Sequence, residues 1–60
     1  MEAKVSNFLF KLDRAAGVIE VFDGSEAVRP IGFIRVKSDV NEKEFHTEIS
    51  YWMIDNSNQF

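Results

Sequence analysis

The sequence predicts a mainly β or small α+β fold, based on an antiparallel meander of three or four strands. Two observations favour this class. Short apolar runs of strand length are separated by turn-forming residues, which is typical of strands that follow one another in a sheet. Neighbouring runs also align as hairpins in which apolar residues face apolar ones and opposite charges face each other. The chain of 60 residues is short, and we expect one small domain over 1–60.

Residues 1–16 fit two structures. As a helix, the segment has one apolar face and ends at Gly17, a good C-terminal cap. As a strand, it pairs with 18–22 through a turn at 13–17, in which Gly17 supplies a positive φ. The residues of the helical face are Val5, Phe8, Leu9, Leu12 and Ala16. The segment is therefore either the first strand or a helix that covers the sheet.

The hairpin interpretation gives a consistent register. If Asp13 faces Val18, then Lys11 faces Glu20, and cross-strand pairs of this kind contribute about 0.2–1 kcal/mol each. The helix leaves Phe10 off its apolar face, so we favour the hairpin. In this register the further pairs are Leu12 with Ile19, Phe10 with Val21 and Leu9 with Phe22.

The rest of the chain predicts two more strands. The polar residues 23–26 form a turn that ends the second strand. Pro30 cannot donate to a ladder and fits the first position of a third strand at about 31–37. A polar loop over 38–44 then leads to a fourth strand over about 45–55.

These last two strands also align as a hairpin. Placing Arg35 opposite Glu48 sets Gly32 opposite Tyr51, where the aromatic ring can lie over bare backbone. One face of this hairpin belongs to the core and carries Ile34, Val36, Ile49, Tyr51 and Met53. The other face carries four large apolar residues, Ile31, Phe33, Trp52 and Ile54, beside the pair Arg35 and Glu48.

This second apolar face is the candidate partner-binding site. A contiguous exposed apolar patch marks an interaction surface, and tryptophan is enriched among the residues that dominate binding. We predict that Ile31, Phe33, Trp52 and Ile54, flanked by Arg35 and Glu48, contact a partner. Leu9 and Phe22 extend this face if the first hairpin forms. The alternative is that an N-terminal helix covers this face and makes it ordinary core.

Composition excludes several other kinds of site. The chain has no cysteine and one histidine, so disulfides and thiolate metal sites are excluded and a structural zinc site is not expected. We therefore predict no metal and no cofactor. A chain this small buries only about 60% of its unfolded surface and is marginal alone. We expect it to associate with another protein or with itself as a homo-oligomer.

Charge and hydropathy limit the class of partner. The 7 basic and 10 acidic residues are interspersed, without the basic patch that nucleic-acid binding requires. No apolar run approaches the ~18 residues of a membrane span, and the first residues do not resemble a signal peptide. We therefore expect no nucleic-acid partner, no membrane partner and a cytoplasmic location.

No motif predicts catalysis. A lone carboxylate on a strand is usually part of a surface ion pair worth about 0–1 kcal/mol, so Glu48 is interpreted as the partner of Arg35 and not as a general base. His46 is interpreted as a solvated residue, not as a metal ligand or pH switch, and Tyr51 as a packing residue. We therefore predict that the protein is not an enzyme.

Two segments resemble a known superfamily. Ile31–Val36, a polar loop and Glu48–Asp55 are similar to two central strands of the GNAT acetyltransferase superfamily, and the similarity covers about 18–55. It implies strands at both segments, with the end of a preceding helix at 1–16. In that family a glycine-containing loop and a helix follow and hold acetyl-CoA through backbone N–H groups. This sequence ends before such a loop and has Ser50 in place of the usual glycine, so no cofactor-binding or catalytic residue is carried over.

Three functions remain after these exclusions. We predict a small protein-binding module, an inhibitor or regulator in the style of small viral or mobile-element proteins, that acts through an apolar sheet face. Such a module can also use an exposed strand edge to extend a sheet. The alternatives are a truncated acetyltransferase-like remnant that binds acyl-CoA or a sister subunit, and a structural homodimer.

Overall fold

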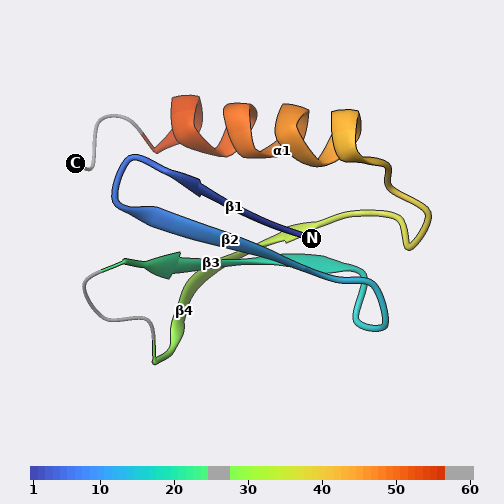
Figure 1. Ribbon diagram of the computed structural model, residues 1–60, viewed down its shortest axis with the longest axis horizontal. Helices are drawn as coiled ribbons and strands as arrows, with labels where there is room; N and C mark the ends of the chain where they lie inside the picture. The colour runs from blue at the N-terminus through green and yellow to red at the C-terminus, as the bar shows by residue number, and fades with distance from the viewer. Residues whose placement is uncertain (25–27, 57–60) are drawn as a thin grey trace.

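Four antiparallel strands and one helix make up the fold (Figure 1). The computed structural model of the chain describes residues 1–24 and 28–56. The strands form a single sheet in the order β1-β2-β3-β4, which confirms the predicted meander and the small α+β class. The elements are β1 (Glu2–Val5), β2 (Phe8–Asp13), β3 (Val18–Asp23), β4 (Pro30–Arg35) and α1 (Glu42–Asp55).

The predicted first hairpin is confirmed in every pair from Asp13–Val18 to Leu9–Phe22. Hydrogen bonds between residues of the turn itself stabilise it. Asp13 accepts hydrogen bonds from the backbone N–H of Ala16 at its side chain (3.1 Å) and from that of Gly17 at its carbonyl (2.9 Å). Gly17 has a φ of +70°, a conformation that glycine adopts at little cost. The helical alternative for 1–16 does not form.

Residues 1–16 supply two strands, of which the sequence predicted only the second. β1 pairs with β2 through a tight turn, with Ala3 opposite Phe10 and Val5 opposite Phe8. Ser6, in this turn, has a φ of +56°. The strand was not expected because its four residues carry only two apolar side chains and no strong turn dipeptide follows them.

The third predicted strand forms as β4, and Pro30 occupies its first position as expected. The strand ends at Arg35, two residues earlier than predicted. A bulge interrupts its pairing with β3 between Val21 and Phe22. Of the predicted turn at 23–26, Asp23 ends β3 and is bonded by the side chain of Asn7 (3.1 Å), while residues 25 and 26 lie outside the described residues.

The predicted fourth strand is wrong, because residues 42–55 form the helix α1. Asn41 caps this helix: its side chain accepts from Glu44 N–H (2.8 Å), and the Glu44 carboxylate accepts from Asn41 N–H (3.1 Å). This reciprocal pair satisfies two backbone donors that the first helical turn leaves free. The predicted hairpin with Arg35 opposite Glu48 is therefore wrong as well. The segment that resembles a GNAT strand, Glu48–Asp55, is helical.

The helix covers one face of the sheet and the core lies between the two layers (Figure 1). Phe45 and Ile49 are buried on the sheet side of α1, and Trp52 continues this row at helical spacing. The Trp52 ring packs edge-on against Phe8 and Phe10, with centroids 5.3 and 5.6 Å apart. Among the described residues, the largest fully buried side chains are Phe10, Phe45, Ile19 and Val21.

Candidate partner-binding surface

The second face of the sheet points away from α1. Paired residues share a face and alternate along a strand, so the residues out of phase with the core form this open face. They include Glu2, Leu9, Lys11, Glu20, Phe22, Phe33 and Arg35. No helix or strand in the described ranges 1–24 and 28–56 is layered over them.

Charged side chains occupy the centre of the open face. Glu2 lies opposite Lys11, and Lys11 lies opposite Glu20, so the signs alternate across three strands. The Lys11 ammonium also lies over the Phe22 ring, 5.3 Å from its centroid. Phe22 is buried, which means that its neighbours on this face already shield it. The open face is therefore amphipathic rather than uniformly apolar.

Exposed apolar side chains collect instead at β4. Phe33 is 61% exposed, Ile31 is 51% exposed and Val28 is 86% exposed; we name these three residues the β4 patch. Ile31 lies at the bulge, between the pairs that Gly32 and Pro30 make with β3. A hollow of about 390 Å³ adjoins the patch and is lined by Asp23, Val28, Arg29, Pro30 and Ile31.

The strand order leaves β4 at one edge of the sheet. The phase of its ladder follows from the hydrogen bond that Val36 N–H donates to the Gly17 carbonyl (2.9 Å). Bonded and non-bonded pairs alternate along an antiparallel ladder. Ile34, opposite Ile19, therefore bonds toward β3. Phe33 and Arg35, in the alternate phase, direct their backbone N–H and C=O groups away from the sheet.

A groove runs between the end of β4 and the first half of α1. Its volume is about 690 Å³; we name it the α1–β4 groove. Val36 and Val40 give it an apolar part, and charged residues of both elements surround them. The lining residues are Arg35, Val36, Lys37, Val40, Lys43, Glu44, Thr47 and Glu48.

The structure separates the six predicted binding residues. Ile31 and Phe33 are both exposed on β4, and Leu9 and Phe22 share the open face with Phe33. Arg35 and Glu48 line the α1–β4 groove from its two sides. They are not cross-strand neighbours, because Glu48 belongs to the helix.

Trp52 and Ile54 lie away from the β4 patch. Trp52 is half-buried on the opposite face of the sheet, against Phe8 and Phe10. Ile54 is 68% exposed near the end of α1, on the same outer part of the helix as Tyr51. The expectation that Trp52 and Ile54 share a strand face with Phe33 is wrong, since α1 replaces the strand.

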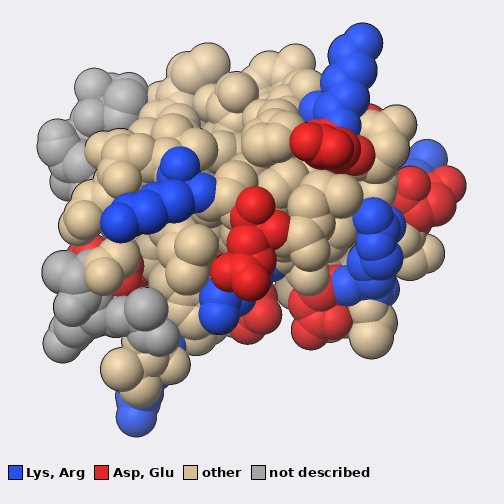
Figure 2. All heavy atoms as spheres, viewed as in Figure 1, with Lys and Arg blue, Asp and Glu red and all other residues tan. Residues whose placement is uncertain are grey.

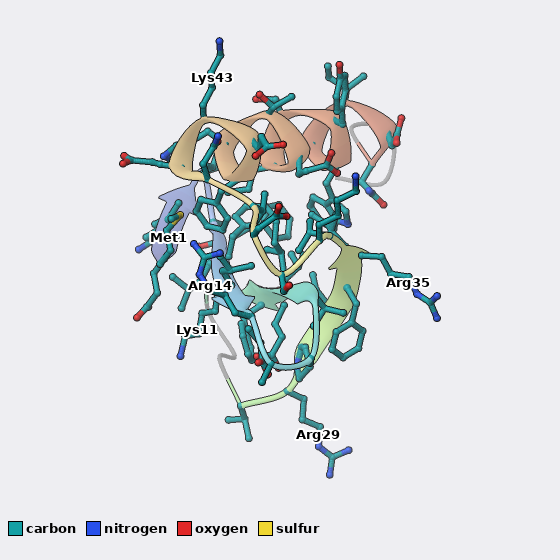
Figure 3. The ribbon with its side chains drawn as sticks, turned by 90° about the vertical axis from the view of Figure 1, so that its right-hand side faces the viewer. Met1, Lys11, Arg14, Arg29, Arg35 and Lys43 are labelled. Atoms are coloured by element: carbon teal, nitrogen blue, oxygen red, sulfur yellow. The ribbon has the colours of Figure 1, made fainter. Side chains whose placement is uncertain are left out.

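Basic side chains frame the β4 edge. Figure 3 shows the Arg29 and Arg35 side chains extending away from the body of the protein beside β4, and Lys37 follows two residues later. Residues 28–37 contain no Asp or Glu. Elsewhere the charges are mixed: Figure 2 shows both signs interspersed among uncharged residues on the viewed face.

The remaining titratable groups form no recognisable centre. His46 lies 3.9 Å from Glu42 one helical turn earlier, and both side chains are exposed to water. Within the described part of the chain, no three His, Cys, Asp or Glu residues are grouped as a metal site would require. No helix in that part combines the length and hydropathy needed to cross a bilayer.

The chain matches no protein-family model, no curated protein and no solved structure. Its surface chemistry is therefore the basis for a functional proposal. Sequence reasoning found Ile31 and Phe33 but missed Val28 and the α1–β4 groove. Val28 could have been noticed in the sequence because it is an apolar residue two positions before Pro30, where the predicted strand begins.

Proposed function

We propose that the chain is a non-enzymatic protein-binding module that acts through the β4 patch and the adjacent edge of the sheet. The observation that carries this proposal is the presence of exposed apolar side chains on an edge strand, Ile31 and Phe33, and in the turn before it, Val28. Exposed apolar groups that cluster next to charged residues are typical of interaction sites. By occupying a surface of its partner, such a module regulates or inhibits that partner.

The surroundings of the patch support binding over a purely structural role. The opposite face of the same sheet is covered by α1 and contains the core, so the fold does not need the β4 patch for its own packing. Edge strands with exposed apolar residues attract other chains unless they are protected. An exposed apolar edge of this kind therefore favours a role in binding a partner that covers it.

The experiment compares two aromatic residues that are equally exposed. Phe33 is 61% exposed in the β4 patch, and Tyr51 is 60% exposed on α1. The immobilised chain and its Phe33→Ser and Tyr51→Ser variants are incubated with extract of the native host, and the captured proteins are quantified by mass spectrometry. We expect Phe33→Ser to reduce capture of the specific partner about tenfold, equivalent to about 1.4 kcal/mol, and Tyr51→Ser to leave capture unchanged.

Folding is controlled by circular dichroism of each variant. Equal losses for Phe33→Ser and Tyr51→Ser, or a loss for Tyr51→Ser alone, would contradict binding through the β4 patch. Unchanged capture by Phe33→Ser would contradict it too. Each of these outcomes places the binding surface, if one exists, away from β4.

A further inference from the structure

We infer that the partner binds as an extended segment that adds a fifth strand to the outer edge of β4, with apolar side chains in the α1–β4 groove and acidic side chains on the open face. This inference rests on the proposed function and specifies the chemistry of the partner. Strand addition is an established mode of recognition, in which backbone hydrogen bonds give affinity and pockets for alternate side chains give specificity.

The backbone of β4 supplies the hydrogen-bonding groups for such a strand. Val36 bonds to Gly17, so the alternate residues Phe33 and Arg35 direct two N–H and two C=O groups outward. Pro30 and the bulge between Val21 and Phe22 interrupt the edge at the start of β4. The regular part of the edge therefore runs from Gly32 to Arg35, and Arg35 lines the groove.

A fifth strand on the outer edge of β4 would reach the α1–β4 groove at the Arg35 end, because Arg35 and Val36 line the groove. Side chains of an added strand alternate between the two faces of the sheet. On the helix side they meet the groove, whose apolar part is formed by Val36 and Val40. Charges of both signs surround this apolar part, the carboxylates of Glu44 and Glu48 and the cations of Arg35, Lys37 and Lys43, so Val36 and Val40 rather than a net charge favour apolar side chains there.

On the open face the basic residues favour acidic side chains in the partner strand. Arg35 lies opposite Val18 in the ladder and so starts from the open face, as does Phe33. Residues 28–37 carry Arg29, Arg35 and Lys37 and no acidic residue, and the open-face carboxylate of β3, Glu20, lies opposite Phe33. Opposite charges on neighbouring strands stabilise a sheet and like charges destabilise it. A partner segment that alternates apolar and acidic residues complements both sides at once.

A second copy of the chain fits this edge poorly. If two β4 strands pair antiparallel about Arg35 or Ile34, the two Arg35 side chains lie opposite or diagonal to each other. If they pair about Phe33, Lys37 approaches Arg29 of the other copy. Each arrangement brings like charges together, because the charged residues within 28–37 are all basic. The charge pattern therefore points to a different, acidic chain.

Synthetic peptides test the inference without knowledge of the partner. Three fluorescein-labelled peptides of roughly eight residues, a typical strand length, alternate valine with glutamate, with lysine or with serine. Binding to the full chain is measured by fluorescence anisotropy. We expect the glutamate peptide to bind at least about tenfold more tightly than the lysine peptide. N-methylation of its alternate backbone amides, which removes donors without changing side chains, is expected to abolish binding.

A pair of variants separates the contribution of the backbone N–H at the edge of β4 from that of the Phe33 side chain. Phe33→Ala and Phe33→Pro both lack the ring, but only proline lacks the outward N–H. Proline at this position leaves the bonds between β4 and β3 intact, because those bonds belong to Gly32 and Ile34. We expect Phe33→Pro to bind the glutamate peptide about tenfold more weakly than Phe33→Ala, while both variants keep the wild-type circular dichroism spectrum.

The outcomes separate this inference from the proposed function. Equal binding by Phe33→Ala and Phe33→Pro, equal affinity for the glutamate and lysine peptides, or no peptide binding up to about 1 mM overturns strand addition. Reduced capture of the host partner by Phe33→Ser still upholds the proposed function in that case. A dimer at micromolar concentration that Phe33→Pro dissociates, or tighter binding of a single-stranded oligonucleotide than of the glutamate peptide, overturns the acidic-strand partner.

Discussion

The indole of Trp52 packs over Gly32: its Nε1 atom lies 3.6 Å from the point that a Cβ atom on Gly32 would occupy. Glycine thus leaves room for the ring in the layer between α1 and β4. Phe8 and Phe10 also contact the ring, edge-on. The relationship fixes the last turns of α1 on the sheet and explains why Trp52 belongs to the core side of the molecule.

Substitutions at Gly32 test how closely the Trp52 ring packs against β4. Because 3.6 Å is an ordinary van der Waals distance, we expect Gly32→Ala to be tolerated and to raise stability by up to about 0.5–1 kcal/mol through the lower entropy of its unfolded chain. Gly32→Val adds two methyl groups that must displace Trp52, at a cost of about 1–3 kcal/mol. Urea denaturation of both variants checks this. Equal stability of the two variants would show that the indole does not constrain this position.

Trp52→Ala is expected to destabilise the fold. The variant loses both aromatic contacts and leaves a cavity, and substitutions of this kind cost about 3–5 kcal/mol when the ring is buried; half-burial of Trp52 places the expected loss near the lower limit. Tyr51→Ala, one residue earlier and exposed, is the matched control and is expected to change stability by less than about 0.5 kcal/mol. Thermal denaturation measures both. A Trp52→Ala variant of unchanged stability would return Trp52 to the list of binding residues.

The first hairpin could be predicted because its evidence is local. The turn at Asp13 and Gly17, the apolar pairs and the pair Lys11–Glu20 all agree on one register, and a shift by one residue would send every apolar side chain to the other face. The structure has the same register. The short strand β1 could not be predicted in this way, because Ala3 and Val5 are the only apolar side chains that it places opposite β2.

The helix was missed because its sequence carries two periods. Ile49, Tyr51 and Met53 alternate as in a strand, whereas Phe45, Ile49 and Trp52 follow the spacing of a helix face. The deciding signal was present at 41–44, where Asn and Glu three residues apart form a capping box. The exposure of Ile31 and Phe33 was predicted, whereas that of Val28 was not. The α1–β4 groove could not be predicted, because half of its lining belongs to the helix.

The capping box itself is testable. Asn41→Ala removes the acceptor for Glu44 N–H, and loss of such a cap typically costs about 1 kcal/mol. Asn41→Asp is the control, because it keeps an acceptor and adds a negative charge that the start of a helix favours. We expect Asn41→Ala to lower the midpoint of urea unfolding and Asn41→Asp to maintain it. Unchanged unfolding of Asn41→Ala would mean that tertiary packing alone positions the start of α1.

The turn at Gly17 links the first hairpin to β4 and gives the last prediction. A Cβ atom on Gly17 would lie 3.3 Å from the Val36 carbonyl oxygen, and the φ of +70° is unfavourable for alanine by about 1–2 kcal/mol. Gly17→Ala should therefore destabilise the protein by at least that amount. Ala15→Gly is the control at a neighbouring exposed position of the same turn, and we expect a change below about 1 kcal/mol.

The same variant tests how the turn supports the proposed edge. Gly17 accepts the hydrogen bond from Val36 that fixes which residues of β4 face outward. Amide hydrogen exchange of Gly17→Ala is therefore expected to quicken at Val36 before it changes at the centre of β2, because the added methyl group strains the end of β4 first. Uniform quickening across the sheet would indicate instead that Gly17 acts on global stability, with no separate influence on the edge that β4 presents to a partner.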